Sequence, residues 1–255
     1  MSEAIMQTSA EGLVVLQGEL RGSEVETGIS RRELISLIEA GNVVVLSKLF
    51  DPDTILRLRQ AVLDWSHRTP PFPHDRSASI PHLNFHRRDD GSDPSLLAHR
   101  SHQYAFGDWD AVDPGLSDML QSACRPLLAL QNALAGTDFS LATPGLRCKL
   151  INHPAGGGYL VKHTHPYRPQ KVAFFLSLSR YGQDFATGGA VFDTPWKTVA
   201  LTELFDIGNV VLFRYDLPHE VPPIDPRRPL DWSSPAGLWI LSIELVESYP
   251  NSRMA

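Results

Sequence analysis

The stretch that decides the fold reads GGYLVKHTH at residues 157–165, a pair of glycines followed by a short, largely apolar segment. Consecutive glycines favour a tight turn, because glycine adopts backbone conformations that other residues avoid. In the extended segment that follows, alternate side chains lie on the same face. The stretch therefore predicts a strand in which His163 and His165 point the same way.

Further short apolar runs, rich in β-branched residues, lie on both sides of this stretch and predict more strands. Turn signals separate several of them, at 154–158, 188–189 and 206–209. Several short strands at such spacing are typical of a sandwich or barrel. The predicted strands are 43–46, 146–151, 159–162, 171–177, 190–192, 210–213 and 238–245.

Helical signals concentrate in the first half of the chain. A serine and a glutamate in capping-box spacing open a predicted helix at 30–40. An aspartate followed by proline opens a second helix at 51–65, with apolar residues at three- and four-residue spacing. A third predicted helix, at 114–134, contains Pro126, where we expect a kink or a break.

Length and pattern together predict one domain over residues 1–255, with an α+β but mainly β fold. Residues 1–29 show weak periodicity and are expected to be loosely ordered. Residues 30–144 should form a helical layer together with a long segment at 70–109, which we expect to act as a lid and whose later aromatic residues should be buried. Residues 145–247 should form the β core.

Composition excludes several classes of protein. With a net charge of −6, the chain lacks the excess of basic residues that is typical of a nucleic-acid binder. Two cysteines are too few for a disulfide scaffold or a cysteine-based zinc site. We find neither a signal-peptide pattern nor an apolar run of the roughly 18 residues that a membrane span needs. The expectation is a cytoplasmic protein without nucleic-acid or membrane partners, whose oligomeric state the sequence does not define.

A third histidine, His219, follows the predicted strand 210–213 after a short turn. Two ligands from one strand and a third from a distant strand are a recurring way to hold a metal ion in a β-barrel, and imidazole suits iron, zinc, copper or nickel. Three protein ligands leave coordination positions open, as in catalytic sites. We therefore predict a metal site at His163, His165 and His219; a His-x-His pair on an exposed strand without metal is the alternative.

The order of these motifs resembles that of the iron(II)/2-oxoglutarate-dependent oxygenase superfamily. There, a glycine turn leads into His-x-Asp/Glu, and later Gly-Gly and Gly-x-x-x-x-Phe strands precede a distal histidine. The matching segments here are 157–165, 188–192, 208–213 and His219, and the resemblance covers roughly 145–245. It implies a double-stranded β-helix (jelly roll) with supporting N-terminal helices, Fe(II) as the metal and 2-oxoglutarate as the co-substrate.

One position departs from the family pattern, because His165 stands where a carboxylate is expected. Four interpretations remain open. His165 completes an all-histidine triad; it points away and leaves two ligands; Asp184 or Glu220 supplies a carboxylate; or the site binds a ligand without turnover. Related halogenases have a small residue at this position, so an imidazole argues against halogenation.

The resemblance also implies a cation for the distal carboxylate of 2-oxoglutarate, and arginine suits this role because its planar fork matches a carboxylate. The family's basic residue lies shortly after the distal histidine, which points to Arg228 and then to Arg227, unless both are solvated loop residues. Lys171 is the next candidate. Asn152 and Arg147 are expected to contact either carboxylate.

By this resemblance the protein should be an Fe(II)/2-oxoglutarate-dependent dioxygenase that hydroxylates or desaturates a small molecule and releases succinate. No catalytic residue beyond the metal ligands is assigned. A cupin-like three-histidine dioxygenase that does not use 2-oxoglutarate is one alternative, although Gln170 stands where the cupin motif has a glutamate. A non-catalytic jelly-roll binding protein is another.

Overall fold

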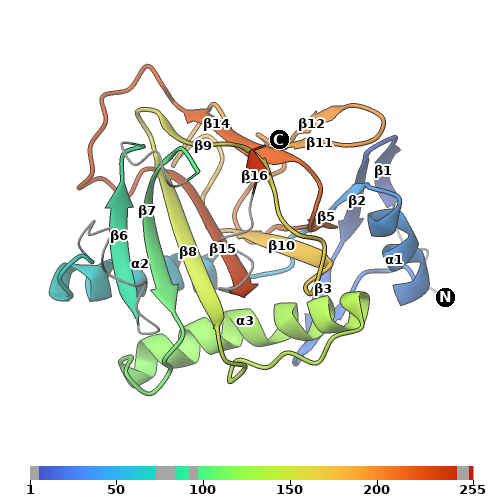
Figure 1. Cartoon of the computed structure of the whole chain (residues 1–255), viewed down its shortest axis with the longest axis horizontal. Coiled ribbons are helices and arrows are strands. Elements are labelled where there is room, and N and C mark those ends of the chain that lie inside the picture. The colour runs from blue at the N-terminus through green and yellow to red at the C-terminus, as the bar shows by residue number, and fades with distance from the viewer. Residues whose placement is uncertain (1–5, 73–83, 92–96, 246–252, 255) are drawn as a thin grey trace.

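A computed structural model describes residues 6–72, 84–91, 97–245 and 253–254 (Figure 1). Its helices are α1 (Arg31–Glu39), α2 (Pro52–Arg68) and α3 (Pro114–Ala135). Its strands are β1 (Met6–Ala10), β2 (Leu13–Gln17), β3 (Glu19–Arg21), β4 (Glu24–Glu26), β5 (Val43–Ser47), β6 (Phe85–Asp89), β7 (His99–Phe106), β8 (Leu146–Pro154), β9 (Gly158–Thr164), β10 (Val172–Ser177), β11 (Val191–Asp193), β12 (Thr198–Ala200), β13 (Val210–Arg214), β14 (His219–Ile224), β15 (Gly237–Leu245) and β16 (Arg253–Met254).

One hydrogen-bonded sheet folds back on itself to form two facing layers (Figure 1). The first layer has the order β5-β13-β10-β15-β8, and the second has the order β9-β14-β11-β12. Strand β7 joins them, because its later residues pair with β8 and its first residues pair with β9. This is the predicted jelly roll, a mainly β fold with helices outside the first layer.

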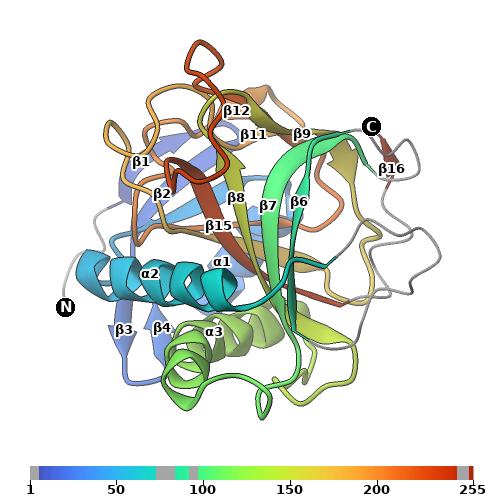
Figure 2. The ribbon, with the colours of Figure 1, turned by 90° about the vertical axis from the view of Figure 1, so that its left-hand side faces the viewer.

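The helices begin where the sequence predicts. The side chains of Ser30 and Glu33 form the capping box of α1, and Asp51 caps α2. Helix α3 continues through Pro126 instead of ending there, since buried residues on both sides of the proline hold it against the sheet. Helices α2 and α3 pack together outside the first layer (Figure 2). No helix in the described ranges is long and apolar enough to cross a bilayer.

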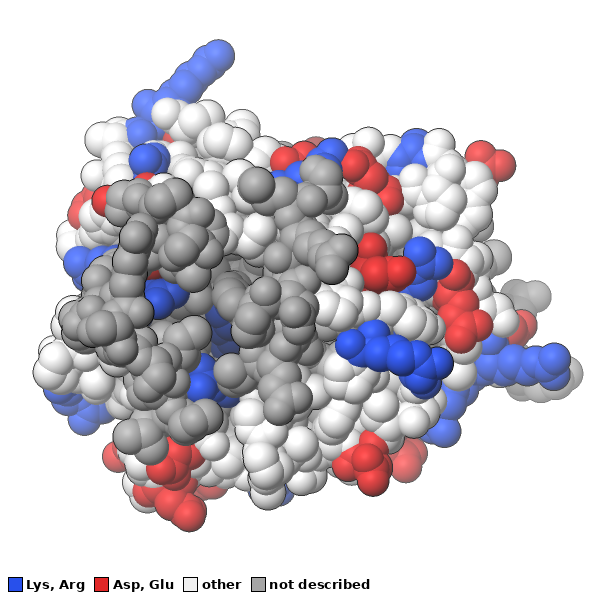
Figure 3. All heavy atoms as spheres, viewed as in Figure 1, with Lys and Arg blue, Asp and Glu red and all other residues white. Residues whose placement is uncertain are grey.

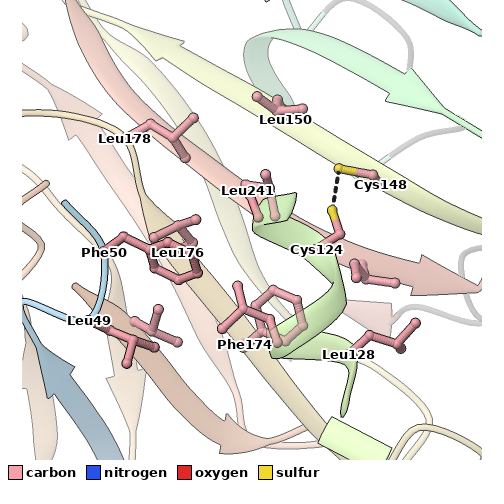
Figure 4. Close-up of a cluster of buried hydrophobic side chains, with 14 of the residues drawn as sticks. Leu49, Phe50, Cys124, Leu128, Cys148, Leu150, Phe174, Leu176, Leu178 and Leu241 are labelled. Atoms are coloured by element: carbon pink, nitrogen blue, oxygen red, sulfur yellow. Dashed lines mark hydrogen bonds between the residues drawn. The ribbon is translucent and has the colours of Figure 1, made fainter. Parts of the chain in front are cut away.

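A hydrophobic core fills the space between the helices and the first layer. Figure 4 shows Cys124 of α3 against Cys148 of β8, with their sulfur atoms 3.1 Å apart and both thiols free. Tyr104 and Phe106 of β7 are fully buried in the same core, which confirms the prediction for these two aromatics. The core therefore occupies one face of β8, and the opposite face points between the two layers.

Two segments expected to be irregular contain strands. Residues 13–17 form β2, which pairs in parallel with β5 and buries Val14, Val15 and Leu16. This run is too short to show a periodicity. Within 70–109, β6 and β7 pair and extend the sheet, while 73–83 and 92–96 lie outside the described residues. The buried polar side chains of β6 and β7 interrupt the alternation of apolar residues by which a strand is recognised in a sequence.

Candidate metal centre

The three histidines singled out by the sequence meet between the two layers. His163 lies near the end of β9, and His219 begins the neighbouring strand β14 directly opposite it in the antiparallel register. His165 follows β9 and lies on the same side as His163. One nitrogen from each ring can be chosen so that the three lie within 4.8 Å of one another. The predicted convergence is thus confirmed.

The spacing of the ring nitrogens suits a single ion. The Nε2 atoms of His163 and His165 lie 3.1 Å apart. Two nitrogens bound to one ion at about 2.1 Å and at right angles would lie about 3 Å apart. The ring centroids of His163 and His219 are 4.3 Å apart, and those of His165 and His219 are 5.4 Å apart. The histidine side chains are therefore arranged around one point in space.

Backbone carbonyl groups orient two of the rings. Nδ1 of His163 lies 3.0 Å from the carbonyl oxygen of Val161, and Nδ1 of His219 lies 2.8 Å from that of Leu217. A carbonyl oxygen can only accept, so Nδ1 carries the hydrogen in both rings and donates it. Each Nε2 then carries the lone pair that a metal ion would use, with the usual outer-shell support of a histidine ligand behind it. Nε2 of His163 lies at hydrogen-bond distance from Nε2 of His165.

Aromatic side chains fix the remaining freedom of the rings. The ring of His165 stacks on that of Tyr215, with centroids 4.6 Å apart and planes at 10°. His219 is surrounded by Phe175, Phe192 and Phe213, whose centroids lie between 5.1 and 5.8 Å from its own. Packing of this kind holds an imidazole in one orientation before any ligand arrives.

Burial keeps all three imidazoles neutral. It lowers the pKa of His163, and it lowers that of His219 well below the usual value. Burial, and then the neighbouring His163, lower the pKa of His165 to about 4. A neutral imidazole is the form that binds metal. The three side chains therefore fit a divalent transition-metal ion, with positions left open for other ligands.

The triad opens into a small cavity between the layers. Its volume of about 40 Å³ is enough for a few water molecules. Its walls are largely apolar. The polar side chains opposite the histidines come from two paired strands of the first layer, with Lys149 on β8 and with Ser242 and Glu244 on β15. Nζ of Lys149 lies 3.4 Å from a carboxylate oxygen of Glu244.

The five residues predicted to hold 2-oxoglutarate lie in different places. Arg227 and Arg228 are exposed in the loop after β14, where Arg228 is 3.5 Å from Asp225. Nζ of Lys171 donates to a carbonyl oxygen at the end of α3. Asn152 is on the face of β8 that bears the helix-side core. Arg147 lies on the same face of β8 as Lys149 and opposite Glu244 in register.

The two carboxylates weighed as replacements for the missing ligand do not join the triad. Asp184 forms a 2.7 Å ion pair with Arg59 of α2. Glu220, next to His219 but on the other face of β14, lies 3.8 Å from Lys162. Among the described residues, the acidic side chain that lines the cavity is Glu244. Sequence reasoning missed it, although it is the charged residue of the predicted strand 238–245.

Strand β8 also brings His153 to the cavity. Its side chain is 1% exposed, and in the ranges that the structure describes neither ring nitrogen has a partner in good hydrogen-bond geometry, although backbone groups of Arg100 and Tyr159 lie near the ring and oppose the lowering of its pKa. Burial, and then the nearby His99, lower the pKa of His153 to about 3. The ring is therefore neutral near pH 7.

The metal-free protein is expected to lose stability between pH 7 and pH 5, with about 2 kcal/mol of the loss due to His153. Below its ordinary pKa of 6.5, the unfolded chain binds a proton that the fold excludes until about pH 3. His153→Leu removes this difference, so urea unfolding at both pH values should show a correspondingly smaller loss. An equal loss of stability in the wild type and in His153→Leu would contradict the assignment of this loss to His153.

Comparisons with known proteins agree with this architecture. No protein-family model matches the chain, and no curated protein is detectably similar in sequence. A prolyl-4-hydroxylase from Pseudomonas putida superimposes with a TM-score of 0.56 at 13% identity, covering 84% of this chain and 98% of that one. A prolyl hydroxylase from Trichoplax adhaerens gives 0.53 at 13% identity, covering 86% and 90%.

A third solved structure is SnoK, a non-haem α-ketoglutarate-dependent carbocyclase from nogalamycin biosynthesis. It superimposes with a TM-score of 0.53 at 11% identity, covering 84% of this chain and 83% of its own. Likeness at such low identity establishes the fold. The chain therefore has the jelly-roll fold of the 2-oxoglutarate-dependent oxygenases and carries a cluster of three histidines inside it.

Proposed function

We propose that this protein is an iron(II)-dependent oxygenase that uses 2-oxoglutarate and oxidises a small molecule. The observation that carries the proposal is the convergence of three neutral imidazoles inside a fold shared with 2-oxoglutarate-dependent enzymes. Bound together, iron and 2-oxoglutarate supply the activation of oxygen and the decarboxylation to succinate that drive oxidation of a substrate. The chain itself orients these groups and excludes water.

The ligand set in this proposal is His163, His165 and His219. The carbonyl groups behind two of the rings and the stacked Tyr215 orient their nitrogens before the metal binds. The phenylalanines around His219 exclude water from that side of the centre. The open positions face the cavity, where a co-substrate and a substrate would meet.

Lys149 is our candidate for the cation that receives a carboxylate of 2-oxoglutarate. It lies in the same cavity as the triad, and Arg147 lies two residues away on the same face of β8. Both cations lie on the face of β8 that points between the layers. A positive charge in a site of low dielectric favours an anionic ligand.

Two observations support a small-molecule substrate. The cavity has room for only a few water molecules, so a ligand must be compact or must displace side chains. On the face seen in Figure 3, acidic and basic side chains are interspersed, which suits solubility better than docking on a highly charged polymer.

The test is succinate formation. Protein loaded with Fe(II) should convert 2-oxoglutarate to succinate in air, slowly without its substrate, and mass spectrometry of the product measures this. Binding of 2-oxoglutarate to the Mn(II)-loaded protein should weaken roughly 10- to 100-fold in Lys149→Met, as expected for losing a charge-assisted hydrogen bond. No succinate and no binding of 2-oxoglutarate would overturn the proposal.

A three-histidine dioxygenase that does not use 2-oxoglutarate is the second candidate. The observation that favours it is the pairing of Lys149 with Glu244, because this cation already has a carboxylate partner within the cavity. Such an enzyme would consume oxygen together with its substrate and form no succinate. Calorimetry of the Mn(II)-loaded protein with 2-oxoglutarate separates the two candidates without knowledge of the substrate.

A further inference from the structure

The proposed metal centre has a charge that its three ligands do not balance. Imidazole binds a metal ion in its neutral form, so three histidine ligands leave a bound divalent ion its full charge. A buried ion is costly unless an opposite charge lies nearby. A carboxylate outside the ligand set would reduce this cost.

Glu244 lies in the right place for such a carboxylate. It lines the same cavity as the triad and comes from the facing layer, on the same face of β15 as Ser242. Its side chain is 16% exposed. His163, His165 and His219 line the same cavity, and charges interact strongly across a site of low dielectric.

Two neighbours hold the carboxylate of Glu244 in position. The hydroxyl of Ser242 donates to Oε1 at 3.0 Å, and Nζ of Lys149 lies 3.4 Å from Oε2. An ionised carboxylate has about four lone-pair sites, so these contacts leave capacity for a further donor from the cavity. Lys149 comes from β8, paired with Ser242 in register, so the arrangement is fixed by the sheet.

We propose that Glu244 is the counter-charge of the metal centre. Acting from the opposite wall of the cavity, it offsets the charge of the ion and accepts a hydrogen bond from the water or ligand group at an open position. It is a positioning residue and not a ligand, because the close cluster of ligand atoms comprises the three histidines alone among the described residues. The inference rests on the proposed divalent metal, but not on 2-oxoglutarate.

Two substitutions that remove opposite charges, Glu244→Gln and Lys149→Gln, test this role. Binding of Mn(II), followed by electron paramagnetic resonance of the free ion, should weaken 10- to 100-fold in Glu244→Gln, the usual effect of losing an outer-shell partner. In Lys149→Gln the same measurement should show tighter binding, because a positive charge near the ion has been removed. A purely structural ion pair would predict weaker binding in both variants, and that result overturns the proposal.

Glu220→Gln is the matched control, because Glu220 adjoins His219 in sequence but lies on the other face of β14, near Lys162. Its Mn(II) affinity should equal that of the wild type. If the wild type binds no Mn(II), the proposed metal function fails. If the wild type and Glu244→Gln bind equally tightly, only the role of Glu244 fails. Should Glu244→Gln not fold, the direction of the change in Lys149→Gln decides.

Discussion

Replacing His219 with alanine is expected to abolish tight binding of divalent metal ions. His219 is buried, opposes His163 across β9 and β14, and has its Nδ1 hydrogen committed to a carbonyl group. Loss of an outer-shell partner already weakens metal binding 10- to 100-fold, so loss of a ligand should exceed about 100-fold. Calorimetry with Mn(II), Co(II) or Ni(II) measures the difference.

Two further variants serve as comparisons for His219→Ala. His67→Ala removes an exposed histidine of α2 and should leave the affinity unchanged. His165→Asp restores the residue type that the resemblance leads one to expect, and it should retain metal binding because the side chain points to the same site. Unchanged affinity in His219→Ala would show that the three rings do not share an ion.

Replacing Gly208 with alanine is expected to destabilise the fold by about 3 kcal/mol or more. Gly208 opens the segment that leads to Phe213, and its φ of 80° lies in the region that favours glycine. A methyl group there would collide with the carbonyl oxygen of Phe50, whose own amide donates to Gly208 at 3.1 Å. Urea unfolding of the two proteins measures the loss.

Gly182→Ala is the matched control for this substitution. Gly182 has the same φ of 80°, but an added methyl group would meet no heavy atom within 4 Å. Gly182→Ala should lower the free energy of unfolding only by the penalty for placing alanine at a positive φ, about 1 kcal/mol. Equal losses at the two positions would show that the close approach of Phe50 does not matter.

The apolar strands of the first layer could be predicted because their runs are nearly continuous. The stretches at 172–177, 210–214 and 238–245 are buried on both faces and read as apolar segments. That His163 and His165 lie on the same side was also predictable, because alternate residues of an extended strand share a face. The place of His219 beside them depends on the pairing of β9 with β14 and was expected from the order of motifs in the resemblance.

Features that depend on pairing between distant strands could not be predicted. Strand β14 contains Pro222 and Pro223, which argue against a strand in sequence, yet it pairs with both β9 and β11. Arg228 was expected to hold a carboxylate of 2-oxoglutarate because of its distance in sequence from His219. It lies instead in a long loop at 225–236 that comes before β15. The place of Lys149 beside Glu244 depends on the register of β8 and β15, which nothing in the local sequence specifies.

The two free cysteines bear on how the protein would withstand its own proposed chemistry. Both thiols are buried on the helix side of β8, whereas the candidate site lies on the other side of that strand. Burial raises the pKa of Cys148 well above its usual value, and the protonated form is a poor target for peroxide. Oxidative damage during turnover should therefore fall first on the histidines and aromatic rings beside the metal, with the sulfur atoms spared while the fold persists.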